Sequence, residues 1–316
     1  MNDLDTLFDD NLPEDHRSGV VAVVGRPNVG KSTLINRILG QKIAIVTPKP
    51  QTTRRQQLGI YTDERGQILF TDTPGLHKPL HRLGQYMVHV AEEAIQDADI
   101  ILWVLDVSVA PHDGDRIIAE TLARLSGRTP VMLALNKVDL VDTGQMERQT
   151  ALYQTLIPHV AALTVSALTG AGITDLVNDL LHRLPRGPRY YPADQVSEVN
   201  LRFIAAEVIR EKIILSTEEE IPYSVAVEVT EFKERSADLN YINATIYVER
   251  DSQKAIIIGK GGEMIKRIGT DARAELVELL GAQVYLDLHV KVLKNWRMDA
   301  DLLRRLGYRL PRDRES

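Results

Sequence analysis

Residues 25–32, GRPNVGKS, constrain the fold more than any other stretch of this 316-residue chain. They fit the phosphate-binding pattern G-x-x-x-x-G-K-[ST], and they stand between an apolar run, VVAVVG, and a helical pattern. Glycines let backbone N–H groups approach phosphate oxygens, and a helix N-terminus adds positive potential. Lys31 is expected to reach the β and γ phosphates of a triphosphate, and the Ser32 hydroxyl to coordinate Mg²⁺. A tight turn with accidental spacing is the alternative, and the flanking strand and helix disfavour it.

The first 184 residues predict an α/β domain. Short apolar runs alternate with helical patterns from Gly19 to about Leu184. Near-continuous apolar strands separated by helices indicate a mostly parallel sheet with helices on both faces. The expected strands are 20–25, 66–73, 99–107, 130–137 and 161–167. The expected helices are 33–39 and, roughly, 84–98, 115–125, 145–156 and 173–184.

Two motifs at strand ends suit a guanine nucleotide. DTPG, residues 72–75, places Asp72 to hold Mg²⁺ through water and the Gly75 N–H near the γ-phosphate. NKVD, residues 136–139, ends in a carboxylate that can accept from both N1–H and N2–H₂ of guanine. Adenine presents no such donor pair, so Asp139 argues against ATP, the alternative nucleotide.

The neighbours of that carboxylate complete the expected nucleotide site. Asn136 can brace the loops, the Lys137 stem can cover the base, and in SAL the Ala167 N–H is placed to meet guanine O6. All four motifs fall at the carboxyl ends of strands, where open α/β sheets bind ligands. Together, in order, they resemble the nucleotide domain of the translation-factor-related GTPases. The expected nucleotide-binding residues are Gly25, Arg26, Pro27, Asn28, Val29, Gly30, Lys31, Ser32, Thr33, Asp72, Thr73, Pro74, Gly75, Asn136, Lys137, Asp139, Ser166 and Ala167.

This resemblance implies a switch at residues 47–59, TPKPQTTRRQQLG. In such GTPases a Thr of this segment binds Mg²⁺ and senses the γ-phosphate. Thr53 is the first choice for that role and Thr52 the second; a plain surface loop is the alternative. The expected metal ligands are therefore Ser32, Thr53 and Asp72, and the expected catalytic residues are Lys31, Thr53 and Gly75.

Two positions bear on catalysis. Leu76 stands where Ras-type enzymes carry a Gln that orients the attacking water, and a Leu side chain cannot polarise water. We therefore expect slow hydrolysis without stimulation, with positioning and Mg²⁺ supplying most of the catalysis. Asn28 resembles an Asn that in some relatives helps to hold a monovalent cation, here K⁺. A loop-shaping hydrogen bond is its equal alternative.

A second glycine loop, GKGG at residues 259–262, follows an apolar run. Glu263 stands where a nucleotide loop needs Ser or Thr, so this loop lacks the hydroxyl for Mg²⁺. A G-x-x-G loop between helices and beside a small sheet resembles the KH module, which clamps about four unpaired nucleotides. A glycine turn between helices is the alternative. The expected RNA-binding residues are Ile258, Gly259, Lys260, Gly261, Gly262, Lys266 and Arg267, while Ile256, Ile257 and Ile265 are expected to divide between groove floor and core.

The Pro-rich stretch at 184–194, LPRGPRYYPAD, marks a domain boundary. After it, the patterns predict a helix, a hairpin with a polar loop, a short helix, the glycine loop, a helix to about Leu280 and a final strand. The helix is expected at 199–215, and the strands at 223–232, 241–250 and 284–293. We expect an acidic tail at 1–18, a GTP-binding domain at 19–186, a linker at 187–198 and a smaller α+β KH-type domain at 199–316.

Composition limits the remaining classes. The chain has no Cys, which excludes disulfides and thiolate metal sites, and no apolar run approaches the roughly 18 residues of a membrane span. Residues 251–316 hold 13 Lys and Arg against 10 Asp and Glu, a net charge of +3, whereas the other 250 residues carry −9. This end is therefore the one expected to meet a polyanion. Its late cations are Lys291, Lys294, Arg297, Arg304, Arg305 and Arg309, for which a solvated helix face is the alternative.

A guanine-nucleotide domain followed by one KH domain resembles the bacterial Era GTPases, over residues 19 to about 309. The matching segments are GRPNVGKSTL, QTTR, DTPGLH, NKVD, IREK, PYSVAVE, IIIGKGG and LGY. The resemblance implies GTP and GDP as ligands, binding of 16S rRNA near its 3′ end and action in 30S subunit assembly. It also implies a cytoplasmic protein with partial peripheral association with the inner membrane; we expect a monomer that does not bind DNA. Two rivals are a GTPase whose KH-like domain contacts protein, and a GTP-binding interaction protein without useful hydrolysis.

Overall fold

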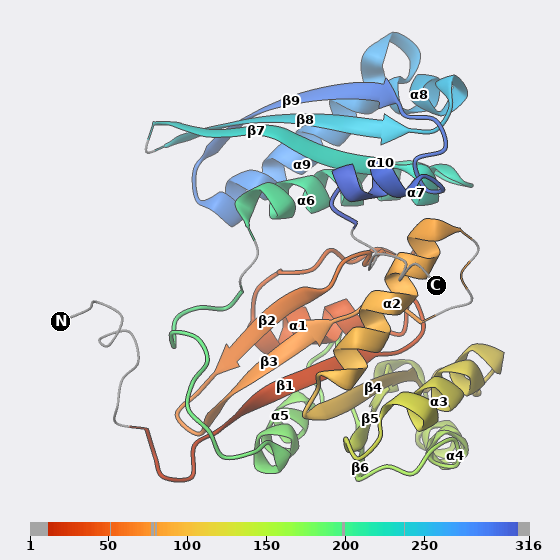
Figure 1. Cartoon of the computed structure of the whole chain (residues 1–316), viewed down its shortest axis with the longest axis vertical. Coiled ribbons are helices and arrows are strands. Elements are labelled where there is room, and N and C mark those ends of the chain that lie inside the picture. Colours follow the sequence, from red (N-terminus) through yellow and green to blue (C-terminus); the bar gives the residue numbers. More distant parts are fainter. Residues whose placement is uncertain are drawn as a thin grey trace, which may run out of the picture. The chain divides into compact units, whose positions relative to one another are not determined.

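The computed structural model describes residues 12–50, 52–76, 79, 81–197, 200–236 and 238–308. The chain divides into two compact units (Figure 1). The first comprises Met1–Ala44, Thr53–Lys78 and Met87–Glu198, and the second comprises Ile45–Thr52, Pro79–Tyr86 and Val199–Ser316. Two short segments thus group with the C-terminal residues, a feature that a division based on linear composition did not anticipate. The domain limits given above remain predictions.

The first unit is built on a six-stranded sheet, in the order β2-β3-β1-β4-β5-β6. All neighbouring strands are parallel except β2, which pairs antiparallel with β3 at one edge. The elements up to Leu184 are β1 (Arg17–Val24), α1 (Lys31–Leu39), β2 (Gln57–Thr62), β3 (Gly66–Asp72), α2 (Arg82–Gln96), β4 (Ile100–Asp106), α3 (Asp113–Leu125), β5 (Val131–Asn136), the 3-10 helix η1 (Val138–Leu140), α4 (Thr143–Gln154), β6 (Ala161–Thr164) and α5 (Ile173–Arg183).

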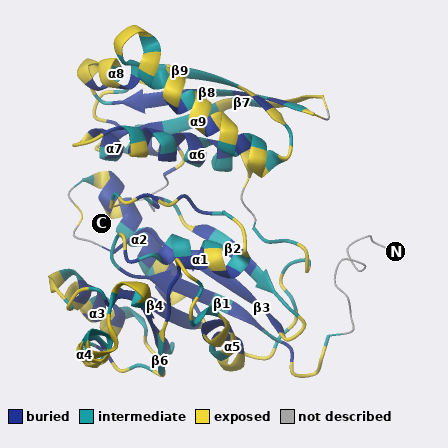
Figure 2. Cartoon of the chain, turned by 180° about the vertical axis from the view of Figure 1, so that it is seen from behind, coloured by how far each residue is buried: buried dark blue, intermediate teal, exposed yellow. Residues whose placement is uncertain are grey.

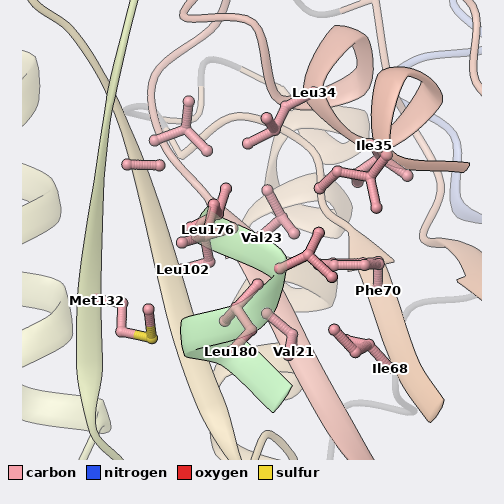
Figure 3. Close-up of a cluster of buried hydrophobic side chains, with 14 of the residues drawn as sticks. Val21, Val23, Leu34, Ile35, Ile68, Phe70, Leu102, Met132, Leu176 and Leu180 are labelled. Atoms are coloured by element: carbon pink, nitrogen blue, oxygen red, sulfur yellow. The ribbon is translucent and has the colours of Figure 1, made fainter. Parts of the chain in front are cut away.

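Alternating side chains of the strands bury two separate cores. Val21 and Val23 of β1 pack with α1 and α5 on one face, and this cluster is drawn in Figure 3. Ala22 and Val24 pack on the other face with α2, α3 and Tyr153 of α4. The central strands are therefore buried on both faces, and Figure 2 shows them dark blue. This double burial explains their continuous apolar runs.

The second unit contains a three-stranded sheet, β7-β8-β9, in which β7 and β8 are antiparallel and β8 and β9 are parallel. Helices α6 and α9 lie on one side of it, and their apolar side chains form a core with Ile242, Ala244 and Ile246 (Figure 1). Its remaining elements are α6 (Leu201–Ser216), α7 (Ile221–Ser224), β7 (Ala226–Ser236), β8 (Leu239–Val248), α8 (Asp251–Ile258), the 3-10 helix η2 (Lys260–Gly262), α9 (Glu263–Leu280), β9 (Gln283–Val292) and α10 (Ala300–Arg305).

The predicted fold class is confirmed, with three local corrections. Strand β2 was not predicted, and it begins inside the segment read as a loop at 47–59. The expected strand start at 223–225 is wrong, because residues 221–224 form α7. The expected polar loop at 233–240 is also wrong, because β7 and β8 continue through most of it. Polar residues are compatible with a strand whose outer face is solvated. For this reason polarity wrongly indicated a loop at β2 and at the adjoining ends of β7 and β8. None of the helices in the described ranges combines the length and the apolar character of a membrane span.

Candidate functional site

Every residue expected to bind the nucleotide lies at one edge of the six-stranded sheet. Residues 25–33 follow β1, residues 72–75 close β3, residues 136–139 close β5, and residues 166–167 follow β6. Thr53 reaches the same edge because β2, which it precedes, pairs with β3 at Gln57 and Asp72. The carboxyl ends of parallel strands are where open α/β sheets place ligands.

The phosphate loop is shaped by glycine and closed by lysine. Gly30 has φ +101°, and a Cβ there would lie 2.4 Å from the Asn136 amide nitrogen, so only glycine fits. The Lys31 ammonium donates to the carbonyls of Gly25 and Arg26, at 3.1 and 3.0 Å. Burial lowers the pKa of Lys31 to about 8, despite the opposing effect of Asp72. A phosphate group would supply the anionic partner that this buried ammonium needs.

Three oxygen-bearing side chains meet beside that lysine. Ser32 Oγ donates to Asp72 Oδ2 at 2.7 Å, and Thr53 Oγ1 lies 3.1 Å from Ser32 Oγ and 3.3 Å from Asp72 Oδ2. Asp72 is fully buried, and within the described structure its Oδ1 has no hydrogen-bond partner. Burial raises the pKa of Asp72, although Lys31 and the two hydroxyls oppose this.

The donor set fits Mg²⁺, which prefers oxygen ligands and would neutralise a buried carboxylate. Across the described residues there is no group of three or more His, Cys, Asp and Glu suited to a metal, so the hydroxyls are needed to complete this site. Thr52, the second choice for the switch threonine, is not part of it. Its hydroxyl donates to the Lys49 carbonyl at 2.8 Å and lies 2.7 Å from the Thr47 hydroxyl.

The expected base-reading residues are held in place by one another. Ser166 Oγ donates to Asp139 Oδ1 at 2.5 Å, which fixes the carboxylate. Asn136 is buried, donates from Nδ2 to the Val29 carbonyl at 2.8 Å, and accepts from the Ala167 N–H at 2.9 Å. One amide side chain therefore ties the phosphate loop to the loop expected at guanine O6.

The remaining expected residues pack the loops together. A Cβ on Gly75 would lie 2.9 Å from the Pro27 nitrogen, so the two phosphate-side loops are in close contact. Thr73 donates to the Val23 carbonyl at 2.7 Å, and Arg26 Nε pairs with buried Asp115 Oδ1 at 2.7 Å. Leu76 is 5 % exposed and belongs to the apolar core, so it does not face a water-filled space. Four expected nucleotide-binding residues remain. Asn28 has φ +64°, Val29 is buried, Thr33 is the third residue of α1, and Pro74 lies within the DTPG loop.

Two side chains that brace the expected site, Arg37 and Asp106, were not predicted from the sequence. Arg37 of α1 donates from Nε to the Ala167 carbonyl at 3.1 Å and also to the Leu168 carbonyl, bracing the base loop. Asp106 accepts from Lys137 Nζ at 2.5 Å; burial alone would raise its pKa, but the bonds from Lys137 and Ser108 outweigh this and lower it. The position of Asp106 at the end of a predicted strand could have indicated a site residue, whereas no sequence pattern pointed to Arg37. A shallow, open pocket of about 330 Å³ beside the base loop is lined by Thr33, Asn36, Arg37, Gly40, Gln41, Lys42, Ala167 and Leu168.

The second glycine loop joins α8 to α9. Gly261 and Gly262 have φ +60° and +82°, and a Cβ on either would meet no atom within 4 Å, so the loop faces open space. Lys260 is exposed, as are Lys266 and Arg267 on the first turns of α9. Of the apolar residues expected to divide between groove floor and core, Ile257 is fully buried, Ile258 and Ile265 are half-buried, and Ile256 is 51 % exposed.

The late cations are partly neutralised. Arg297 pairs with Glu249 at 2.5 Å, Arg304 with Asp301 at 2.9 Å, and Arg305 donates to the Tyr247 hydroxyl at 3.2 Å. Lys291 and Lys294 are exposed, and Arg309 lies outside the described residues. Arg297 and Arg305 thus contact groups of their own domain, whereas Arg304 forms an exposed pair within one helix, as on a solvated helix face. The glycine loop is the stronger candidate for RNA contact.

Comparison with known proteins matches both halves of the chain. Residues 20–137 match a family model described as 50S ribosome-binding GTPase, and residues 220–297 match a model described as KH domain. A point variant of Era from Aquifex aeolicus, solved with GDP·AlF₄⁻, is 38 % identical; the match covers 93 % of this chain and 100 % of that chain, with a TM-score of 0.88. A structure of Era with MgGDPNP and nucleotides 1506–1542 of 16S ribosomal RNA is 37 % identical, with the same coverage and a TM-score of 0.88.

Proposed function

Since this chain belongs to the Era family of GTPases, we propose that it uses the GTP cycle to control binding of the 3′ end of 16S rRNA during 30S subunit assembly. The chain hydrolyses GTP to GDP and phosphate. The observation that carries the RNA proposal is the glycine loop at 259–262. It faces open space at the N-terminus of an 18-residue helix, with exposed Lys260, Lys266 and Arg267 around it. Backbone N–H groups and cations in that arrangement suit a phosphate backbone.

In the proposed mechanism the chain mainly positions charge around the triphosphate. Ser32, Thr53 and Asp72 would hold Mg²⁺, which would supply electrostatic stabilisation of the phosphate oxygens. The Lys31 ammonium adds positive charge at the β and γ phosphates, and the Gly75 N–H donates to the γ-phosphate. Leu76 cannot orient water, so hydrolysis is slow until a partner or a cation adds what is missing.

Several finer features remain our predictions. One is a K⁺ ion held by Asn28. GTP hydrolysis should then be faster in K⁺ than in Na⁺ at equal ionic strength, and equal rates would contradict this prediction. A cytoplasmic site of action follows from the ribosomal RNA target. Peripheral membrane association and a monomeric state are expectations drawn from the family alone.

The RNA proposal is tested by anisotropy with a short RNA oligonucleotide of the 16S 3′ end, measured with a GTP analogue, with GDP and without nucleotide. Lys260→Asp should weaken binding and make it less dependent on salt, because a phosphate contact is lost. Arg148→Asp, an exposed cation on α4, is the charge-changing control and should bind as the wild type does. Wild-type binding that is absent or insensitive to salt would favour the rival in which this domain contacts protein.

A further inference from the structure

The outer face of the β7-β8-β9 sheet carries an aromatic stack that neither glycine loop uses. Along β8, Ile242 and Ala244 point into the core, so Tyr241 and Asn243 point to the opposite face. In the parallel pairing of β8 with β9, Tyr241 is the register partner of Tyr285. Two tyrosines therefore lie side by side on the face that α6 and α9 leave uncovered.

The stack has three layers and one free end. The Tyr241 and Tyr285 rings are stacked, with centroids 5.7 Å apart and planes 22° from parallel. The Arg235 guanidinium carbon lies 4.3 Å from the centre of the Tyr241 ring. Because β8 lies between β7 and β9, Arg235 and Tyr285 approach Tyr241 from opposite sides. Tyr285 is 60 % exposed on a strand that ends the described sheet, so no further strand covers the outer side of its ring.

Hydrogen-bonding side chains adjoin this stack on the same face. Asn243 Nδ2 lies 3.2 Å from Asp287 Oδ2 and 3.3 Å from His289 Nε2, and Thr230 donates to Asn243 Oδ1 at 2.7 Å. Amide, carboxylate and imidazole groups are the partners that nucleobase edges use.

At the other end of the same face, the central strand β8 is covered. Tyr247 is only 5 % exposed and is contacted by Arg305 of α10 and by Glu228. Along β9 the same face stays open, with Tyr285, His289 and Lys291 exposed, and Tyr285 is the aromatic ring on this open strand.

We propose that the exposed Tyr285 ring is a stacking site for a base of single-stranded RNA, separate from the G-x-x-G clamp. Every base has a π face, so an exposed ring backed by a second ring and a guanidinium suits RNA without a sequence requirement. This inference rests on the proposed RNA function. A peptide strand added to the edge of β9 is the competing occupant, but main-chain pairing at an edge would not require a stacked aromatic pair.

The position of the ring implies a longer RNA footprint than the clamp alone. Helix α9 leads from the glycine loop to the start of β9, and its 18 residues span about 27 Å. Tyr285 is the third residue of β9, so it lies at the end of the unit remote from the loop. The clamp holds about four nucleotides, and Tyr285 would take a base several nucleotides further along the strand.

The experiment compares a 4-nucleotide RNA, which fits the clamp alone, with a 15-nucleotide RNA, using fluorescence anisotropy. Tyr285→Ala should weaken the longer RNA by roughly 5- to 150-fold, as expected for one lost base stack, and leave the shorter RNA unchanged. Tyr285→Phe keeps the ring and should bind both RNAs as the wild type does. Tyr190→Ala removes a tyrosine that is 51 % exposed in the first unit and should change neither affinity.

The short RNA separates the two proposals. If the wild type binds neither RNA, the proposed function is wrong, and the stacking site, which rests on it, is overturned with it. If both RNAs bind and Tyr285→Ala does not weaken the longer one, the base-stacking site is wrong and the peptide occupant replaces it. Equal losses for both RNAs would also overturn the proposal, because the site would then not be separate from the clamp.

Discussion

Replacing Asp139 with Asn should transfer base preference from guanine to xanthine. Ser166 Oγ donates to Asp139 Oδ1 at 2.5 Å, and it can keep the same bond to the amide oxygen of Asn. The amide nitrogen then replaces Oδ2 and presents N–H donors where the carboxylate accepted. Guanine has a donor, N2–H₂, at that position, whereas xanthine has the C2 carbonyl oxygen. The substitution therefore opposes guanine and matches xanthine.

The expected loss for GDP has two parts. One hydrogen bond to a charged acceptor disappears, worth about 1.5–3 kcal/mol. Two donors are then left facing each other without partners, which costs about 1–3 kcal/mol more. The sum, about 2.5–6 kcal/mol, corresponds to roughly 10²- to 10⁴-fold weaker binding of GDP. Xanthosine diphosphate regains a donor–acceptor pair and should bind the variant more tightly than the wild type.

Calorimetry with GDP and with xanthosine diphosphate, at a fixed Mg²⁺ concentration, measures both affinities. Asp142→Asn is the matched control, since Asp142 is an exposed N-cap of α4 whose side chain accepts from the Gln145 N–H. Asn caps a helix as well as Asp does, so this control should bind both nucleotides as the wild type does. If Asp139→Asn keeps GDP affinity within about threefold and gains nothing for xanthine, Asp139 does not read the base.

Three further predictions concern side chains at or beside the nucleotide site. Because the pKa of Lys31 is about 8, GDP binding should take up about half a proton per molecule at pH 8 and about a tenth at pH 7, so the apparent affinity for GDP falls as pH rises through 8. Calorimetry in buffers of different ionisation enthalpy measures this proton uptake, and equal uptake at both pH values would contradict the prediction. Arg37→Ala should weaken GDP binding about tenfold by freeing the Ala167 loop, and it should leave the affinity for a 2-aminopurine nucleotide, which lacks O6, unchanged. Equal losses of affinity for both nucleotides would show that Arg37 acts elsewhere. Leu76→Gln should reduce the free energy of unfolding by about 2–4 kcal/mol without accelerating GTP hydrolysis, because the amide enters an apolar core. Faster turnover at an unchanged melting temperature would refute this prediction.

Much of the first unit could be predicted because its central strands are buried on both faces. Ile100–Asp106 and Val131–Asn136 are wholly buried, and their apolar runs carry a clear signal. The edge strand Gln57–Thr62 has neighbours on one side only within the main sheet, and its mixed composition is that of a loop. The polar continuation of β7 and β8 was missed for the same reason, since one face of that sheet is open.

The nucleotide site could be predicted where a motif carries the chemistry of its own ligand, as Lys31 and Asp139 do. Arg37 could not, because its partners are backbone carbonyls about 130 residues away, and a carbonyl leaves no mark in a sequence. The pairing of Tyr241 with Tyr285 was equally hidden, because it depends on the register of two strands separated by two helices.

The two hydrogen bonds made by the Asn136 side chain have a consequence for the rate of nucleotide release. Its amide holds the Val29 carbonyl and the Ala167 N–H at once, so the phosphate loop and the base loop cannot part without breaking a buried hydrogen bond. Release of GDP should then be a single concerted opening rather than a peeling from one end. Any partner that pries open either loop would loosen both ends of the nucleotide, and a small surface contact far from the phosphates would suffice to speed exchange.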